Sequence, residues 1–346
     1  MTTSHTPDFE LDRPGTVIAA VPAVLGFVPE MSLVLVTVDR GELGCVLRID
    51  LAEDMTDQIA HLAEVAAAAR PDGAVAVIVD EHGAGCHPCN DDYRDVAEQL
   101  ADELDYRGIE LLGAHVVDRV AAGGHWHCAD GCGRGGVIED PSSSPLALAA
   151  VLDGRRLYTG RAELQAVIAV DPTRSAALAE VIAACEGPEM SDADACAAIT
   201  EARVAAAHVA DGGTLADELA ARLGRALRDV RVRDTLFALA VGEDADRAEA
   251  LWVSLARILP AAYRVEALVL LAFSAYARGD GPLAGVSLEA ALRIDGSHRM
   301  AGMLDQALQS GLRPERIREL AVTGYRLADQ LGVRLPPQRI RRRRAG

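Results

Sequence analysis

Two closely spaced pairs of cysteine residues carry the clearest chemical signal in this sequence. Cys86 and Cys89 form a C-x-x-C motif, and Cys128 and Cys132 form a C-x-x-x-C motif. Paired thiols at these spacings can form a disulfide, hold a metal ion or exchange disulfides with another protein. Histidines stand beside both pairs, at His87, His125 and His127.

The first hypothesis is a redox switch at Cys128 and Cys132. A C-x-x-x-C motif in a glycine-rich segment can close into a disulfide with little backbone strain. The neighbouring His125 and His127 could stabilise a thiolate. Closure would order the loop and change the surface offered to a partner. We therefore interpret the chain as a redox-responsive regulatory protein that acts through a protein partner, with transcription control under oxidative stress as the expected setting.

The second hypothesis is a structural zinc site, although the redox hypothesis itself requires no cofactor. Zinc is commonly held by four cysteines, or by three cysteines and a histidine. Both cysteine pairs follow expected strands, and loops at the carboxyl ends of parallel strands leave the same edge of a sheet. Zinc release on oxidation would combine the two hypotheses. The candidate ligands are Cys86, Cys89, Cys128, Cys132, His125 and His127.

The third hypothesis is enzymatic. Cys86 and Cys89 lie between a buried strand and an acidic helix, as in a thioredoxin-like dithiol oxidoreductase, where the helix N-terminus lowers the thiol pKa. The later strand hairpin with its partner proline is not recognisable, however. The sequence also lacks a phosphate-binding loop motif, a dinucleotide glycine fingerprint and a G-x-S-x-G motif. We therefore expect a regulatory protein rather than an enzyme. The other cysteines, Cys45, Cys185 and Cys196, are predicted to be small core residues.

Arginines offer a weaker candidate for anion binding. Arg48 and Asp50 are two residues apart on an expected strand, so their side chains share one face of the sheet. Arg156 lies close to Arg155 and Arg161. These groups could bind an anion or brace the fold, and the pattern favours the structural role.

The elements that must position the first cysteine pair alternate between strand and helix. Continuous apolar runs rich in β-branched residues predict buried strands, and alanine-rich amphipathic segments predict helices. The alternation predicts an α/β domain with a mostly parallel sheet and one hairpin. Residues 121–144 are rich in glycine and are predicted to be an irregular, functional loop. The expected strands are 32–38, 43–51, 74–80 and 109–117, and the expected helices are 16–27, 57–70 and 91–106.

Beyond residue 145 the sequence predicts only helices. Residues 265–298 resemble one tetratricopeptide unit, a helical hairpin that would offer a docking surface. The predicted organisation is a flexible leader at 1–14, an α/β domain at 15–160, an all-α domain at 161–335 and a basic tail at 336–346. The expected helices are 145–153, 161–170, 173–186, 193–209, 214–228, 230–241, 244–258, 262–278, 282–294, 298–310 and 313–331.

The charge of the chain excludes broad contact with nucleic acid. Its formal net charge is −18, whereas a nucleic-acid-binding face is basic. The exception is the tail at Arg341, Arg342, Arg343 and Arg344, the only segment through which direct DNA binding is conceivable. The N-terminus lacks a signal-peptide pattern, and the apolar runs are too short to span a bilayer. We therefore expect a cytoplasmic protein, where closely spaced cysteines are more typical of metal or redox sites than of structural bridges.

The N-terminal region resembles a known family. Residues 22–34 read P-x-x-L-G-F-x-P-E-x-S-L-V, and residues 48–51 read R-x-D-L. Together with the segment Gly124-His-Trp-His-Cys-Ala-Asp-Gly-Cys132, they resemble the actinobacterial domain of unknown function 4192 family. The family's Cys-Cys-Pro is replaced here by Cys132-Gly133-Arg134, and the C-x-x-C motif at Cys86 is not expected across the family. The resemblance implies a two-part architecture, α/β followed by helical, and it implies no activity.

Overall fold

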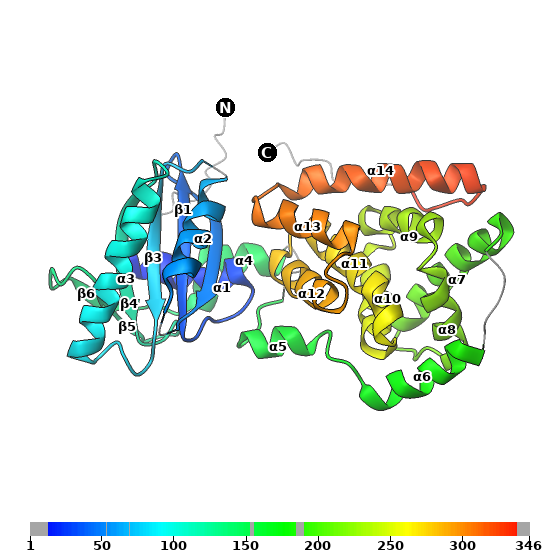
Figure 1. The fold of residues 1–346 in the computed structure, drawn as a ribbon, viewed down its shortest axis with the longest axis horizontal. Helices are drawn as coiled ribbons and strands as arrows, with labels where there is room; N and C mark the ends of the chain where they lie inside the picture. Colours follow the sequence, from blue (N-terminus) through cyan, green and yellow to red (C-terminus); the bar gives the residue numbers. More distant parts are fainter. Residues whose placement is uncertain (1–12, 53, 69, 153–155, 185–189, 338–346) are drawn as a thin grey trace. The chain divides into compact units, whose positions relative to one another are not determined.

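A computed structural model describes residues 13–52, 54–68, 70–152, 156–184 and 190–337 of the chain. The chain divides into two compact units, Met1–Glu163 and Leu164–Ala345. The first unit is α/β and the second is helical, as the sequence predicts (Figure 1). Most of the predicted leader, the arginines at the end of the basic tail, and Cys185 lie outside the described residues.

The first unit is built on one mixed sheet of six strands in the order β2-β1-β3-β4-β5-β6. The four longer strands lie close to the predicted positions. β1 and β3 are buried along almost their whole length, because helices cover both faces of this part of the sheet. The strands are β1 (Ser32–Asp39), β2 (Glu42–Asp50), β3 (Gly73–Val79), β4 (Glu110–Val117), β5 (His125–Cys128) and β6 (Gly135–Val137).

The prediction of a mostly parallel sheet is wrong. Only β3 and β4 pair in parallel, and every other pairing among the six strands is antiparallel. The strands that alternate with helices, β2, β3 and β4, do run in one direction. β1, however, lies between β2 and β3 and is antiparallel to both. The alternation of strand and helix therefore predicted the relative directions of β2, β3 and β4. The pairing differs because β1, the hairpin partner of β2, lies between β2 and β3.

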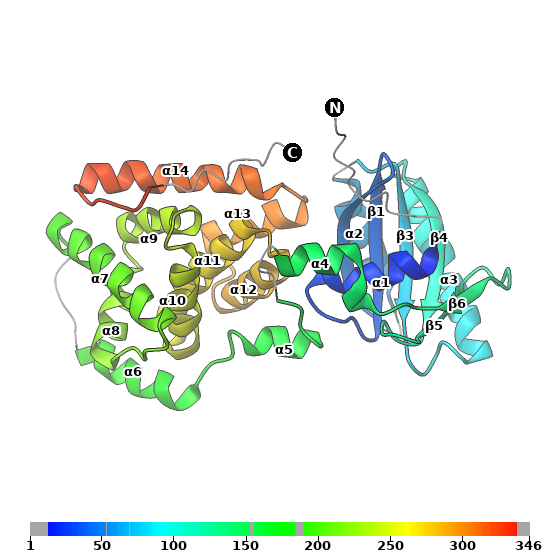
Figure 2. The same ribbon diagram turned by 180° about the vertical axis from the view of Figure 1, so that it is seen from behind.

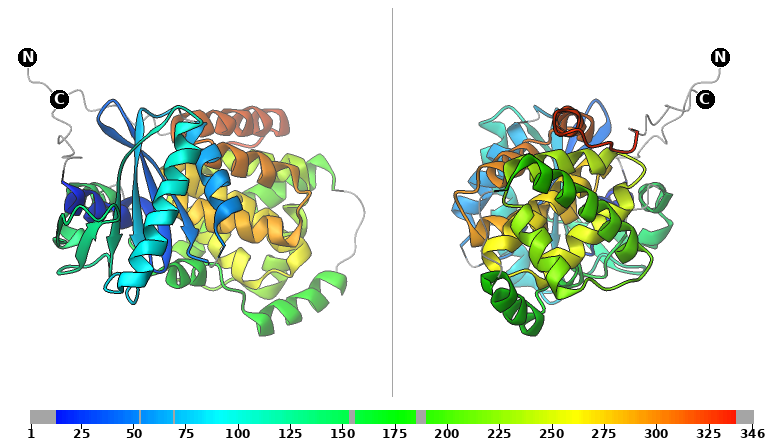
Figure 3. Two further views of the ribbon diagram at one scale, coloured as in Figure 1. Left: turned by 60° about the vertical axis from the view of Figure 1, so that its left-hand side comes forward. Right: turned by 90° about the vertical axis from the view of Figure 1, so that its right-hand side faces the viewer.

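Helices cover the two faces of this sheet differently. α2 (Thr56–Ala67) and α3 (His87–Asp105) pack on one face over a core that includes Leu33, Ile59, Ile78 and Leu100 (Figures 1 and 3). α1 (Pro14–Leu25) crosses the opposite face, together with α4 (Pro145–Leu152) (Figure 2). Pro14 stands in the first turn of α1, and the helix ends at Gly26, whose φ of 73° is in the left-handed region. The sheet thus has one face under α2 and α3 and another under α1.

The predicted irregular loop at residues 121–144 is more ordered than expected. It contains β5, β6 and a short 3-10 helix, η1 (Pro141–Ser143). β5 returns antiparallel along β4, so that Cys128 lies opposite His115 and Trp126 lies opposite Val117. The loops that follow β3 and β5 therefore begin at opposite ends of the sheet. The predicted zinc site shared by the two cysteine pairs needed both loops to begin at the same end, so this prediction of the geometry is wrong.

The second unit consists of helices packed around an apolar core, with no strand among its described residues (Figure 3, right). Trp252 and Phe273 are its largest fully buried side chains, and the rings of Phe273 and Phe237 lie 4.6 Å apart. The elements are α5 (Arg161–Ala166), α6 (Pro172–Ala184), α7 (Asp192–Ala210), α8 (Asp217–Ala226), α9 (Val230–Leu236), η2 (Phe237–Val241), α10 (Ala245–Ile258), α11 (Ala261–Arg278), α12 (Gly281–Ile294), α13 (Arg299–Gln309) and α14 (Pro314–Leu331).

Candidate functional site

The second cysteine pair lies on a tight turn that follows β5. Cys128 is the last residue of β5, and the exposed Cys132 lies in the turn that follows it. The backbone N–H of Cys132 donates to Oδ1 of Asp130 at 3.0 Å. Gly131 and Gly133 adopt φ values of 72° and 78°, which glycine reaches without steric cost. One potential ligand atom from each of Cys128, Asp130 and Cys132 lies within 4.8 Å of the other two.

A buried histidine lies directly beside this turn. The Nδ1 atom of His115 is 3.7 Å from the Sγ atom of Cys128. Burial lowers the pKa of His115 to about 4, so its imidazole is neutral at neutral pH. The ring also packs edge-on against Trp126, with the ring centroids 5.3 Å apart. His115 contacts Cys128 from the neighbouring strand because paired residues of adjacent strands point to the same face. We name Cys128, Asp130, Cys132 and His115 the thiol turn.

The environment of Cys128 favours the protonated thiol. Burial is the largest cause, and the neighbouring Cys132 adds to it, so that the pKa of Cys128 is raised to about 11. A hydrogen bond from the Cys132 side chain is the largest cause that lowers the pKa of Asp130. The turn therefore places one ionised carboxylate beside two sulfur atoms. Cys132 is the exposed sulfur, and Cys128 is the half-buried sulfur behind it.

The two histidines that precede Cys128 in the sequence do not share its surroundings. Side chains alternate along β5, so His125 and His127 point to the face opposite Cys128. Nε2 of His127 lies 3.1 Å from Oδ1 of Asn90, at the start of α3. Nδ1 of His125 lies 3.7 Å from a carboxylate oxygen of Asp118. The histidine that contacts Cys128 is therefore His115.

The first cysteine pair lies at the N-terminus of α3. Cys86 occupies the N-cap position without a side-chain capping bond, and Cys89 lies in the first turn and packs against the core beneath α2 and α3. The hydrogen bond with Cys86 is the largest cause that raises the pKa of Cys89, followed by burial. The two thiols are thus adjacent, while the side chain of His87 lies outside the described residues.

A buried carboxylate lies next to this pair. Asp80 follows β3 and accepts hydrogen bonds from the backbone N–H groups of His82 and Gly83, each at 2.9 Å, and from the hydroxyl of Tyr93. Burial raises the pKa of Asp80, but these hydrogen bonds outweigh it and leave the pKa lowered. Burial and the Asp80 carboxylate raise the pKa of Tyr93. Asp80 and Tyr93 therefore fasten the start of α3 to the end of β3.

Cys89 of the first pair and Cys128 of the second lie on different faces of the sheet. Cys89 packs beneath α3, whereas Cys128 shares the opposite face with His115 and Trp126. Among the described residues, the thiol turn is the only place where three cysteine, histidine or acidic side chains come close enough to share a metal ion. The structure thus forms two local thiol centres, and it does not gather all four sulfurs at one point.

The arginines considered for anion binding are engaged with protein groups. Nε of Arg48 donates to the hydroxyl of Ser32 at 2.8 Å, and its Nη2 pairs with Asp50. Arg156 forms an ion pair with Glu163 at 3.1 Å and stacks over the ring of Tyr158 at 5.1 Å. These contacts give both side chains a bracing role within the fold.

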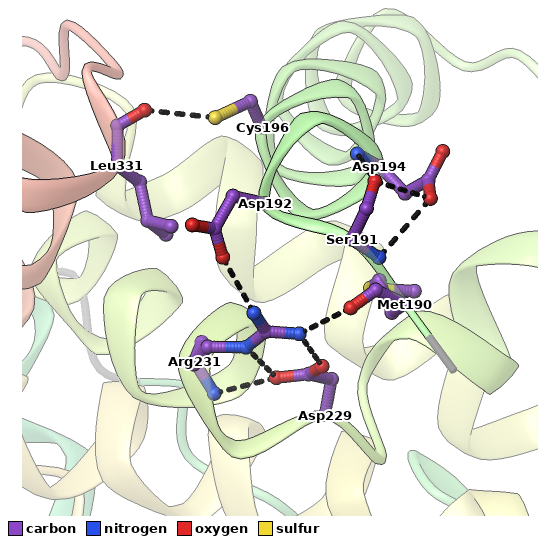
Figure 4. A network of polar contacts seen from close by, with 8 residues as sticks. All are labelled: Met190, Ser191, Asp192, Asp194, Cys196, Asp229, Arg231 and Leu331. Atoms are coloured by element: carbon purple, nitrogen blue, oxygen red, sulfur yellow. Dashed lines mark hydrogen bonds and ion pairs between the residues drawn. The ribbon is translucent and has the colours of Figure 1, made fainter.

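Two of the remaining cysteines make local contacts. Cys45 on β2 lies 3.3 Å from the hydroxyl oxygen of Thr37. The thiol of Cys196 on α7 donates to the carbonyl of Leu331 at the end of α14, at 2.8 Å (Figure 4).

Figure 4 also shows how the start of α7 is fastened to the start of α9. Arg231 donates to Asp192 and Asp229, and to the carbonyl of Met190, each at 2.6 Å. The contacts around Cys196 hold helices together, and no second cysteine among the described residues contacts it.

Comparison with known proteins yields one family and no characterised relative. The family described as "Domain of unknown function (DUF4192)" matches residues 14–315. No curated protein and no solved structure matches the chain. None of the described helices is both long enough and apolar enough to cross a membrane.

Proposed function

The chain belongs to this family of unknown function (DUF4192), and we propose that it is a thiol-based, redox-responsive regulatory protein whose switch is the Cys128–Cys132 pair. The observation that carries the proposal is the proximity of the two sulfur atoms on a turn with two left-handed glycines. Glycine at these positions lets the turn adjust when the two sulfurs join. The family description supplies no activity, so the proposal rests on this geometry.

The chemistry requires a peroxide as the oxidant. The exposed Cys132 thiolate attacks the peroxide O–O bond and becomes a sulfenic acid, releasing one water from hydrogen peroxide. The Cys128 sulfur then attacks the sulfenic sulfur, an S–S bond forms, and a second water leaves. Two thiols and one peroxide thus give one disulfide and two waters. The raised pKa of Cys128 makes the second step faster as the pH rises.

Tryptic digestion of the full-length protein after mild peroxide treatment and alkylation tests this proposal. Cleavage after Arg119 and Arg134 isolates Cys128 and Cys132 on one peptide, 120–134, while Cys86 and Cys89 fall on another. We expect peptide 120–134 to lose two hydrogens and to resist alkylation. Cys132→Ser should abolish this loss, and Cys86→Ser is the matched control that should preserve it. A bridge only on the other peptide, or full alkylation of 120–134, would refute the switch.

A zinc-type metal centre at the same turn is the second candidate function. Asp130 favours it, because a carboxylate between two thiols is a ligand for zinc and has no part in disulfide formation. The distance between Cys128 Sγ and His115 Nδ1 also matches the spacing of two ligands around tetrahedral zinc, roughly 3.6 Å from the bond lengths. Of the three potential ligands in the turn, His115 is near Cys128 alone.

Native mass spectrometry with added zinc separates the two candidates. Metal binding must displace the thiol protons, so zinc affinity should rise with pH. Asp130→Asn should weaken binding of one zinc ion while leaving peroxide-driven closure of the disulfide intact. If Asp130→Asn binds zinc as well as the wild-type protein does, the metal centre at the thiol turn is excluded.

The remaining hypotheses about function stay predictions. The position of the C-x-x-C pair at a helix N-terminus supports the hypothesis of a dithiol oxidoreductase. The raised pKa of Cys89 opposes this hypothesis, because it disfavours the reactive thiolate. Insulin reduction tests that activity. A tetratricopeptide-like docking surface at residues 265–298 has little support from burial, since α11 is buried along nearly its whole length from Val265 to Ala277. Action through a protein partner in the cytoplasm is likewise part of the proposal.

A further inference from the structure

A cavity of about 580 Å³ opens on the face of the sheet that carries α1. Three segments form it: the first turn of α1, the strand β6 with the residues before it, and η1 with the start of α4. Its volume lies within the range of small-molecule sites, roughly 300–1,000 Å³. None of the functional hypotheses above uses this cavity. We name it the Trp126 pocket, because the indole of that residue lines it.

The indole of Trp126 brings an unused hydrogen-bond donor to this pocket. Its Nε1–H makes no hydrogen bond with any described residue, and its ring packs on the edge of His115. Glycines at positions 15 and 136 let the backbone approach this nitrogen. A Cβ atom would come to 3.2 Å from Nε1 at Gly15 and to 3.0 Å at Gly136. Side chains at these two positions would therefore crowd the indole nitrogen of Trp126, which is one of the pocket-lining residues.

Charged residues of both signs line the pocket. Arg13 and Arg134 line it and supply positive charge. The first turn of α1 adds few donors, because Pro14 has no N–H and the N–H groups of Thr16 and Val17 donate to the carbonyl of Arg13. Glu139 and Asp140 also line it and supply negative charge. Asp140 already accepts from the backbone N–H of Ser142 at 2.9 Å, which leaves Glu139 as the more available carboxylate.

We propose that the Trp126 pocket binds a nucleoside phosphate of mononucleotide size. The indole N–H donates to an acceptor on the planar base, Arg134 binds the phosphate, and Glu139 accepts from the sugar hydroxyls. Arginine binds phosphate through charge-assisted hydrogen bonds, and carboxylates bind ribose hydroxyls in other nucleotide sites. A lining with one indole donor, one arginine and one carboxylate fits this class of ligand better than it fits a fully apolar ligand.

The pocket adjoins the thiol turn, but the residues that would bind the nucleotide take no part in the thiol chemistry. Gly133 and Arg134 follow Cys132 directly, whereas none of the pocket-lining residues is a cysteine. Replacing both Cys128 and Cys132 by serine should therefore preserve nucleotide binding. Failure of the disulfide switch and failure of the pocket can thus be told apart.

Fluorescence titration of the full-length Trp252→Phe variant tests the pocket, because Trp126 is then the sole tryptophan. The probes are AMP, GMP, CMP and UMP, with adenosine and inorganic phosphate titrated separately. We expect saturable quenching by at least one nucleotide, and a shift of the Trp126 indole N–H resonance in the ¹⁵N-labelled protein. Adenosine or phosphate alone should bind more weakly than the nucleotide.

Arg134→Gln should weaken nucleotide binding by about tenfold or more, because a charge-assisted contact to phosphate is lost. Arg40→Gln, on the exposed turn between β1 and β2, is the matched control and should bind as the parent protein does. The proposal is overturned if no nucleotide binds at millimolar concentration, or if Arg134→Gln binds unchanged. It is also overturned if inorganic phosphate binds as tightly as every nucleotide.

Discussion

At the scale of single residues, the alternation of side chains along a strand decides which histidine can contact the cysteine pair. His125 and His127 precede Cys128 in the sequence, but alternation along β5 directs them to the other face. His115 lies thirteen residues earlier and reaches Cys128 only because β5 returns antiparallel along β4. The sequence could identify the cysteines by their spacing. It could not identify His115, which stands in an expected apolar strand and whose partner depends on strand register.

His115 also predicts how stability depends on pH. Its pKa is about 4 in the folded protein and 6.5 when exposed. Between these values the unfolded chain binds a proton that the folded chain does not. The free energy of unfolding should therefore fall as the pH drops from 6.5 to 4, by about 3 kcal/mol from this group, and stay constant above 6.5.

Urea unfolding of the wild-type protein and of His115→Gln between pH 4 and 7.5 measures this effect. The glutamine cannot titrate, so the variant should lose less stability over that pH range. Carboxylates that titrate in the same range contribute equally to both proteins and cancel in the difference. Parallel pH profiles for the two proteins would show that the pKa of His115 is the same in the folded and the unfolded protein, which would contradict the prediction.

At the scale of elements, long segments were predictable and short ones were not. The four long strands and the helices lie near their predicted positions, because burial imposes a clear periodicity on each. β6 was missed since it is three residues long, Gly135-Gly136-Val137, and glycine has low strand propensity. Gly136 fits there because Trp126, its cross-strand partner, lies over it. The position of β1 between β2 and β3 depends on long-range pairing that local periodicity does not encode.

The junction between β3 and α3 gives an element-scale prediction. Tyr93→Phe removes the hydroxyl that donates to the buried Asp80 carboxylate. We expect it to destabilise the protein by about 2 kcal/mol, since a buried acceptor loses its partner. Tyr106→Phe is the matched control, because Tyr106 follows α3 and is 86% exposed. Thermal or urea unfolding measures both, and an equal effect of the two changes would contradict the importance of the Asp80–Tyr93 hydrogen bond.

At the scale of the whole molecule, each unit contains its own core and one of the two tryptophans. Trp126 belongs to the α/β unit, and Trp252 is buried in the helical unit. Tryptophan fluorescence can therefore follow each unit separately. The indole N–H of Trp252 has no hydrogen-bond partner, so replacement by phenylalanine removes an unsatisfied donor.

We expect the two units to unfold at different denaturant concentrations, because separate cores permit separate transitions. Trp252→Phe reports the α/β unit, and Trp126→Phe reports the helical unit. Circular dichroism at the helical wavelengths should follow the helical unit most closely. If the fluorescence midpoints of the two variants coincide with each other and with the circular dichroism midpoint, the chain unfolds as one cooperative body.

The two edge strands of the sheet, β2 and β6, are both poor templates for aggregation. A free strand edge exposes unpaired N–H and C=O groups, to which an edge of another molecule can add. β6 is too short and too rich in glycine to hold such a strand in register. β2, at the other edge, carries the charged residues Glu42, Arg48 and Asp50. Neither edge strand therefore offers a regular, uncharged template to which a strand of another molecule could add.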